Sequence, residues 1–189
     1  MGHKFIVWTV STAERNVSCV VGNRYDDVLS RAFRGDSNNY WTLTNAAQDY
    51  IKRDWHGYLP PGSCTIVPIP SHVAGSNNRW NARFLAVLPT MRVPDDVSWH
   101  KDLVYHAVWS LRVAIENWNR HHVGEEGGKI RRVVMTGLAT GYGAIKPEKC
   151  ARQMVLAVQH FRQPVLERPR WVQVVERENE IVDTVNERN

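Results

Sequence analysis

The feature that most constrains the fold is an alternation of short apolar runs with longer segments of helical periodicity. The runs are continuous rather than alternating in polarity, as expected of strands that are covered on both faces. Strands that alternate with helices predict an α/β fold, a three-layer α/β/α sandwich with a mostly parallel mixed sheet. We expect Ile130–Thr136 to be a central strand. The predicted strands are Phe5–Val10, Val17–Val21, Cys64–Ile69, Phe84–Leu88 and Ile130–Thr136.

The helical segments have recognisable starts and apolar faces. Ser98 is the expected N-cap of the longest helix, and Pro147 suits the first position of a later one. Shorter helices are expected over Arg24–Phe33 and about Asn45–Trp55, and a last strand over Trp171–Val175. The apolar stripe of the longest helix is Val104, Ala107, Val108, Leu111, Ala114, Ile115 and Trp118, and that of the helix after Pro147 is Ala151, Met154, Val158 and Phe161.

The length and the charge distribution limit the organisation. A chain of 189 residues forms one domain or two small ones, and we expect a single domain over residues 1–175 with a charged tail over 176–189. The net charge is +5, and the tail holds five acidic and two basic residues, so the remainder carries 22 basic and 14 acidic groups. A basic body favours anionic partners. The basic residues are scattered, so charge alone gives nucleic acid only weak support.

The sequence has no pattern typical of a membrane span, a disulfide framework or a zinc site. No apolar run approaches a membrane span, so we expect a soluble protein with no membrane partner, in the cytoplasm or, as an alternative, in the nucleus. Three widely spaced cysteines indicate neither a disulfide framework nor a zinc site, and we expect no metal and no cofactor.

The segment that carries chemistry is a glycine-rich loop between a predicted buried strand and the helix opened by Pro147. The loop contains Gly137, Gly141 and Gly143. Glycines allow positive φ and close approach of a ligand, and successive amide groups before a helix can bind phosphate. The spacing fits neither the P-loop nor the dinucleotide fingerprint of Rossmann folds. A phosphate-binding loop and a purely structural turn both remain open.

Two motifs in this region resemble a known family. The run from Thr136 to Gly143, T-G-L-A-T-G-Y-G, and the helix start P-E-K-C-A-R-Q-M from Pro147 are similar to macro domains of the branch with a G-L-G-T-G-x-G-G loop. The segments 56–62 and 84–94 and Trp109 look like the same branch. The resemblance implies an α/β/α module that binds ADP-ribose or a related NAD-derived nucleotide, and some relatives hydrolyse ADP-ribose derivatives.

Site residues follow from the resemblance position by position. The matching loop would wrap the diphosphate and distal ribose, and Asn23 is either the ribose-binding asparagine or a helix cap. Ala139 and Ala144 stand where that branch often has glycine, and the glycine run expected after residues 19–23 is missing. The ligand-binding loop residues are Gly137, Leu138, Ala139, Thr140, Gly141, Tyr142 and Gly143.

Three functions remain open. The first is binding of ADP-ribose or a related nucleotide, either free or carried by an ADP-ribosylated protein, with weak or no hydrolysis. The second is an enzyme on the same scaffold, a hydrolase of ADP-ribose derivatives or one acting on another small molecule. The third is a ligand-free scaffold or interaction protein. We identify no catalytic residue, because His100 and His106 have no partner that the sequence reveals, His121–His122 read as a helix end, and Cys150 reads as a packing residue.

Overall fold

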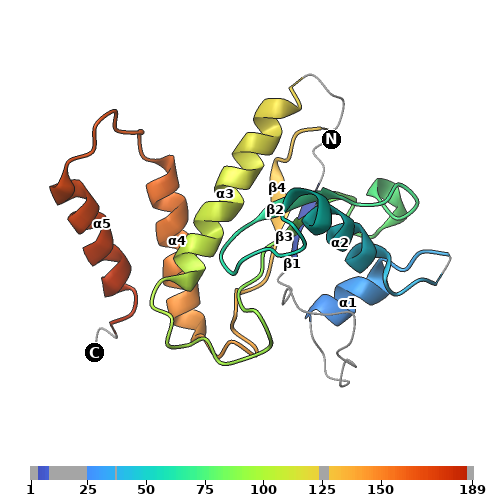
Figure 1. Cartoon of the computed structure of the whole chain (residues 1–189), viewed down its shortest axis with the longest axis horizontal. Helices are drawn as coiled ribbons and strands as arrows, with labels where there is room; N and C mark the ends of the chain where they lie inside the picture. The colour runs from blue at the N-terminus through green and yellow to red at the C-terminus, as the bar shows by residue number, and fades with distance from the viewer. Residues whose placement is uncertain (1–3, 9–24, 37, 124–127, 187–189) are drawn as a thin grey trace.

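The computed structural model describes residues 4–8, 25–36, 38–123 and 128–186. Asn23 and the predicted strand Val17–Val21 lie outside these residues. Within them the chain forms five α-helices, a four-stranded sheet and a short 3₁₀ helix over Gly75–Asn77 (Figure 1). The strands are β1 (Lys4–Trp8), β2 (Thr65–Pro68), β3 (Ala82–Val87) and β4 (Arg132–Val134), and the helices are α1 (Tyr25–Ala32), α2 (Thr42–Asp54), α3 (Leu103–His121), α4 (Pro147–Arg162) and α5 (Trp171–Asp183).

The sheet is mixed, with the strand order β2-β3-β1-β4. Strand β1 pairs in parallel with β3 and β4, with Phe5 opposite Phe84 on one side and Val133 on the other. Strand β2 is antiparallel to β3, with Ile66 opposite Ala86. The α/β class is confirmed, whereas a mostly parallel three-layer sandwich stays a prediction.

The prediction that Ile130–Thr136 is a central strand is wrong. Only Arg132–Val134 joins the ladder, and β4 lies at the edge of the sheet that the described residues form. The run contains Arg131 and Arg132, both exposed, and Val133 is exposed as well. Charged side chains are common on edge strands because they discourage pairing with other chains. The two arginines therefore indicate an edge strand, but the apolar residues around them favoured the prediction of a buried one.

Strand β3 separates two cores. Phe84 and Ala86 join the cluster that includes α3 and α4, whereas Leu85 and Val87 join the cluster that includes α1 and α2. Successive side chains of a strand point to opposite faces, so all four are buried and the continuous apolar run is explained. Figure 1 shows α3 and α4 on one side of the sheet, α1 and α2 on the other, and α5 outside α4.

The helix predictions need three corrections. Helix α3 follows Asp102 rather than Ser98, since the Ser98 amide donates to Asp96 Oδ1 (2.7 Å) in a turn before the helix. Residues Trp171–Val175 form the start of a helix, not a strand, and their apolar side chains recur at helical spacing. The predicted boundary at residue 175 therefore falls inside α5, and the division into domain and tail stays a prediction.

The third correction concerns the inner face of α4, which begins at Pro147 as predicted. Ala151 and Val158 are exposed, and the buried residues are Cys150, Gln153, Ala157 and His160. Gln153 and His160 are polar, so a search for apolar periodicity does not find this face. No helix within the described part of the chain is long and apolar enough to span a membrane.

Candidate functional site

The glycine-rich loop connects β4 to α4 and is anchored by buried apolar side chains. Leu138 and Ile145 are almost fully buried in the α3–α4 core. Two backbone hydrogen bonds close the loop on itself, from the Ile145 amide to Ala139 O (3.1 Å) and from the Ala144 amide to Gly141 O (3.0 Å). The loop is therefore a folded turn with a fixed shape, and its tip, Gly141 and Tyr142, is exposed.

The glycines of this loop do not take the positive φ that their identity suggests. Ala139 (φ 55°) and Ala144 (φ 52°) do so instead, at the two positions where the resembled branch often has glycine. Left-handed backbone is unfavourable for a residue with a Cβ. The backbone at Ala139 and Ala144 therefore has a conformation that glycine adopts readily, and the two alanines are strained there.

Gly143 and Gly141 serve different purposes. A Cβ added at Gly143 would lie 2.6 Å from Ala139 O and 3.0 Å from Met91 Cε, so only glycine allows the two arms of the loop to approach. A Cβ added at Gly141 would meet nothing within 4 Å. Gly143 is thus required by packing, whereas Gly141 faces open space in front of the loop.

Three backbone amides of the loop have no acceptor among the described residues, and that of Gly141 lies at the exposed tip. Among the hydrogen bonds between described residues, none is donated by the backbone amides of Thr140, Gly141 or Gly143. They lie shortly before the N-terminus of α4, where Pro147 occupies the first turn and the helix dipole favours an anion. Glu148 in the same turn opposes an anion close to the helix axis. The arrangement is compatible with a phosphate group at the tip of the loop.

The segment after β3 lies against this loop. The Val97 amide donates to Gly143 O (3.1 Å), and Lys149 Nζ of α4 donates to the carbonyl oxygens of His100 (2.7 Å) and Ser98 (3.3 Å). Burial lowers the pKa of Lys149. Trp99 in this segment is 74% exposed. The backbone of this segment is therefore hydrogen-bonded to the loop at Gly143 and to α4 through Lys149.

Sequence reasoning missed a carboxylate partner of two histidines. His100 Nδ1 lies 3.1 Å from Asp102 Oδ1, and His106 Nδ1 lies 3.7 Å from Asp102 Oδ2. All three side chains are partly exposed. The spacing of four between Asp102 and His106 at a helix start is a signal that could have indicated this contact. A histidine held by a carboxylate can accept a proton through its other ring nitrogen.

The remaining predicted residues fall into clear groups. Leu138 and Ala139 are buried and structural, and Thr140 is half-buried with its hydroxyl donating to Gly137 O (3.3 Å). Cys150 is buried and its burial raises the thiol pKa, which confirms a packing role. Asn23 lies outside the described residues, so its place at the site stays a prediction.

The histidines at the end of α3 are also explained by local structure. His121 Nδ1 and His122 Nδ1 lie 2.7 Å and 2.9 Å from the carbonyl oxygens four residues before them, which confirms a helix end. No group of three or more His, Cys, Asp or Glu side chains in the described ranges could hold a metal ion.

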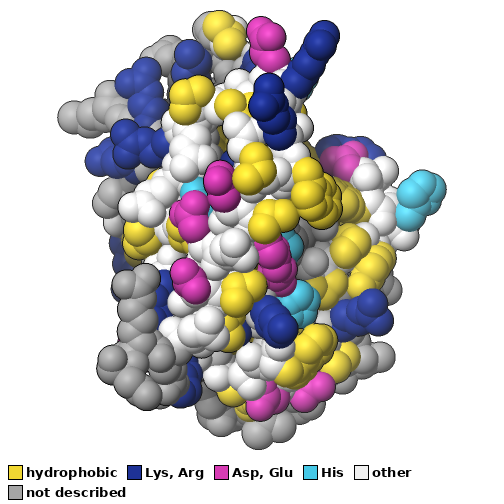
Figure 2. Space-filling model, turned by 90° about the vertical axis from the view of Figure 1, so that its left-hand side faces the viewer, with side chains coloured by type: hydrophobic (Ala, Val, Ile, Leu, Met, Phe, Trp, Pro, Cys, Tyr) yellow, Lys and Arg dark blue, Asp and Glu magenta, His cyan; other side chains and the backbone are white. Residues whose placement is uncertain are grey.

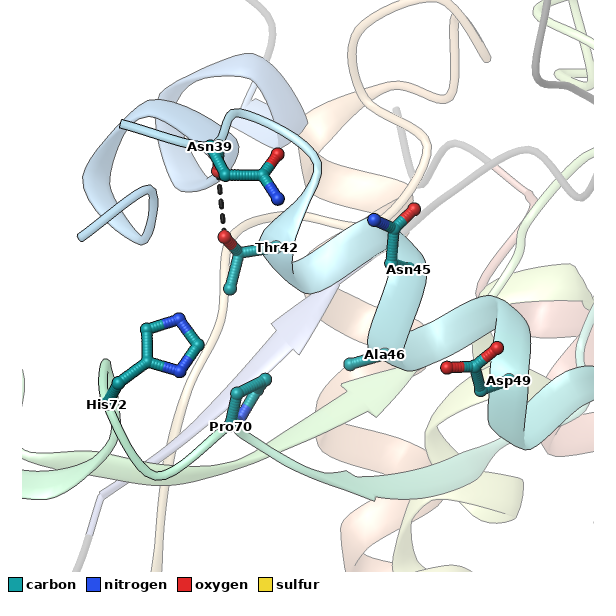
Figure 3. A pocket seen from close by; sticks show the side chains of 7 residues that line it. All are labelled: Asn39, Thr42, Asn45, Ala46, Asp49, Pro70 and His72. Carbon is teal, nitrogen blue, oxygen red and sulfur yellow. Dashed lines mark hydrogen bonds between the residues drawn. The ribbon is translucent and has the colours of Figure 1, made fainter. Parts of the chain in front are cut away.

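A separate open hollow of about 480 Å³ lies between α2 and the segment after β2. Its walls carry polar side chains of α2 and an imidazole from the facing loop (Figure 3), and Thr42 Oγ1 donates to Asn39 O (2.8 Å) within the α2 wall. The hollow is next to the α1–α2 core, whereas the glycine-rich loop is anchored in the α3–α4 core. No motif marks it, so the sequence did not suggest it. The lining residues are Asn39, Thr42, Asn45, Ala46, Asp49, Pro70 and His72.

Comparison with known proteins identifies the fold. No family model matches this chain, and no curated protein sequence matches it. Among solved structures, the Oceanobacillus iheyensis macrodomain with MES bound is similar, with a TM-score of 0.53 and 14% sequence identity. The match covers 85% of this chain and 70% of that chain. At this identity the likeness concerns the fold alone: the chain has a macrodomain-like fold.

Proposed function

We propose that this chain binds ADP-ribose or a related NAD-derived nucleotide through the loop Gly137–Gly143. The observation that carries the proposal is the set of amide groups of Thr140, Gly141 and Gly143, which no described residue uses and which precede the N-terminus of α4. Successive amides at such a place bind phosphate oxygens. The macrodomain-like fold supports a diphosphate nucleotide over other phosphate compounds.

Two further features support the proposal. The space in front of Gly141 is open, so a diphosphate could approach the backbone closely. The chain carries a net charge of +5, which favours encounter with an anionic ligand. An ADP-ribosylated protein would present the same chemical group, so the proposed partners are the nucleotide itself and proteins modified with it.

Calorimetric titration with ADP-ribose, AMP, NAD and inorganic phosphate tests the proposal. We expect ADP-ribose to bind with one site per chain, more tightly than AMP, because AMP lacks the diphosphate and the distal ribose. Phosphate alone should bind weakly. Lack of binding by every nucleotide would instead favour the third function, a scaffold that has the fold without the ligand.

One observation favours an enzymatic role as a second candidate. The His100–Asp102 pair lies in the segment whose Val97 amide is hydrogen-bonded to the loop, and a carboxylate-held imidazole can act as a general base. Because the glycine run after residues 19–23 is missing, we expect hydrolysis of ADP-ribosylated protein to be weak or absent. Turnover that is lost in His100→Ala, with ADP-ribose affinity unchanged, would support the hydrolase. Loss in Asn23→Ala would assign that role to the earlier loop.

A further inference from the structure

Helix α5 is held on the rest of the chain by one narrow side. Of the 13 described residues of α5, only Ile181 is buried, and Thr184, also buried, follows directly after the helix. On the same side Glu180 Oε2 lies 3.0 Å from His160 Nε2 of α4. The exterior of this face carries acidic, basic and hydrophobic side chains side by side (Figure 2), so it favours no particular partner. The informative contacts of α5 are those on its inner side.

Gln153 of α4 is fully buried and uses its whole amide group on three partners. Its Oε1 accepts a hydrogen bond from the backbone amide of Tyr105 (3.3 Å), in the first turn of α3. Its Nε2 donates to Lys101 O (2.5 Å), in the segment before α3, and to Thr184 Oγ1 (3.0 Å), at the end of α5. The Thr184 hydroxyl donates in turn to Ile181 O (2.6 Å). One side chain therefore connects the segment before α3, the start of α3 and the end of α5.

The segment before α3 is also hydrogen-bonded to the glycine-rich loop. Lys101 is four residues after Val97, whose amide donates to Gly143 O (3.1 Å). Between these points Lys149 Nζ donates to two carbonyl oxygens of the segment. Gly143 is one of the three loop residues whose amides the proposed function assigns to phosphate. Hydrogen bonds and four residues of backbone thus connect the end of α5 to the loop.

We propose that Gln153 couples the docking of α5 to the nucleotide site, so that each stabilises the other; the inference rests on the proposed function of the loop. While α5 is docked, three partners hold the Gln153 amide in one orientation. When α5 leaves, Nε2 loses Thr184, the side chain gains rotamer freedom, and its hold on Lys101 O weakens. The loop then has more conformations, and a ligand must order them when it binds.

The coupling acts in both directions. Because linkage between two equilibria is reciprocal, a ligand on the loop must strengthen the docking of α5 by the factor by which docking strengthens binding. Gln153 is a positioning residue in this account, since it acts on the ligand only through the segment and the loop.

Hydrogen exchange of single amides, followed by NMR without any ligand, tests the connection. Thr184→Val removes the acceptor of Gln153 and nearly keeps the shape of the side chain. Exchange at the amides of Val97 and Tyr105 should then become faster by about fivefold or more. Thr184→Ser keeps the hydroxyl, and Thr44→Val makes the same change on α2, so both should leave these rates as in the wild type. The amides of β3, in the interior of the sheet, report global unfolding and should change less.

A second variant weakens the docking of α5 by another route. Ile181→Ala reduces the buried apolar contact of the helix and removes no partner of Gln153. It should speed exchange at the same two amides. If either Ile181→Ala or Thr184→Val leaves them no faster than the change in β3 explains, the proposal is overturned.

Calorimetric titration with ADP-ribose on the same variants tests the effect on the site. Thr184→Val and Ile181→Ala should weaken binding by about fivefold, whereas Thr184→Ser and Thr44→Val should bind as the wild type does. ADP-ribose should also slow exchange along α5 of the wild type. Equal affinity in all the variants would overturn the coupling and leave the proposed function intact. Lack of binding by the wild type would overturn the proposed function, and exchange without ligand would still decide whether Gln153 connects α5 to the segment before α3.

Discussion

Alanine substitutions at Gly143 and at Gly141, two glycines of the same loop, should change the stability of the protein in opposite directions. In Gly143→Ala the new Cβ would lie 2.6 Å from Ala139 O and 2.7 Å from Ala139 Cβ, inside any real contact distance. Both opposing atoms belong to a buried, hydrogen-bonded turn, so they cannot move aside cheaply. Overpacking of this kind costs about 1–3 kcal/mol, and the backbone contact places this case at about 2–3 kcal/mol.

In Gly141→Ala the added methyl group meets nothing and the backbone is not left-handed. A glycine replaced at such a position stabilises by about 0.4–1 kcal/mol, because the unfolded chain loses freedom. For a chain of this size 1 kcal/mol corresponds to about 2–4 °C in Tm. Thermal unfolding should therefore show a fall of roughly 4–12 °C for Gly143→Ala and a rise of a few degrees at most for Gly141→Ala. Equal effects, or a stabilising Gly143→Ala, would refute the loop geometry described above.

Two other perturbations test the packing and the electrostatics. Gln153 is fully buried and donates to Thr184 Oγ1 (3.0 Å), so Gln153→Ala should destabilise the chain by about 2–4 kcal/mol in urea titrations; a loss under about 1 kcal/mol would show that this network is unimportant. Hydrogen bonds from Arg31 and Tyr40 lower the pKa of Asp27. The stabilisation of the folded state by these hydrogen bonds is present above about pH 4 and is lost as the pH falls through the lowered pKa of Asp27. The stability of Asp27→Asn should therefore decline less between about pH 5 and 2 than that of the wild type. An equal decline in the two proteins would contradict the stabilising role of the hydrogen bonds to Asp27.

Much of the architecture could be predicted because local pattern and tertiary burial agree. The run at β3 is apolar throughout since α3 and α2 cover its two faces, and Pro147 marks the start of α4 because a first-turn residue needs no amide hydrogen. The pattern of apolar residues does not predict the buried face of a helix when that face contains polar side chains. Gln153 and His160 are buried because partners on α3, on α5 and at Thr184 just after α5 satisfy them, and these partners are 20 to 55 residues distant in the sequence.

The structure of the glycine-rich loop was predictable only in part. The glycine spacing correctly marked a turn between a strand and a helix, since only Gly143 permits the close approach there. The backbone strain lies instead at Ala139 and Ala144, and residue identity alone predicts the opposite. The His100–Asp102 contact depends on how the segment before α3 folds back, which the sequence does not reveal.

The most direct test of the central claim is ADP-ribose affinity in three variants of one residue. Gly141 faces open space with unstrained backbone, so Ala, Gln and Glu should all fold there and differ only in size and charge. If the diphosphate lies at this point, Gly141→Gln should weaken binding moderately and Gly141→Glu should weaken it by at least tenfold, about 1.4 kcal/mol. The melting temperature, measured on the same samples, should change little. ADP-ribose affinity that is equal in all three variants and the wild type would contradict the claim that this loop binds the phosphates.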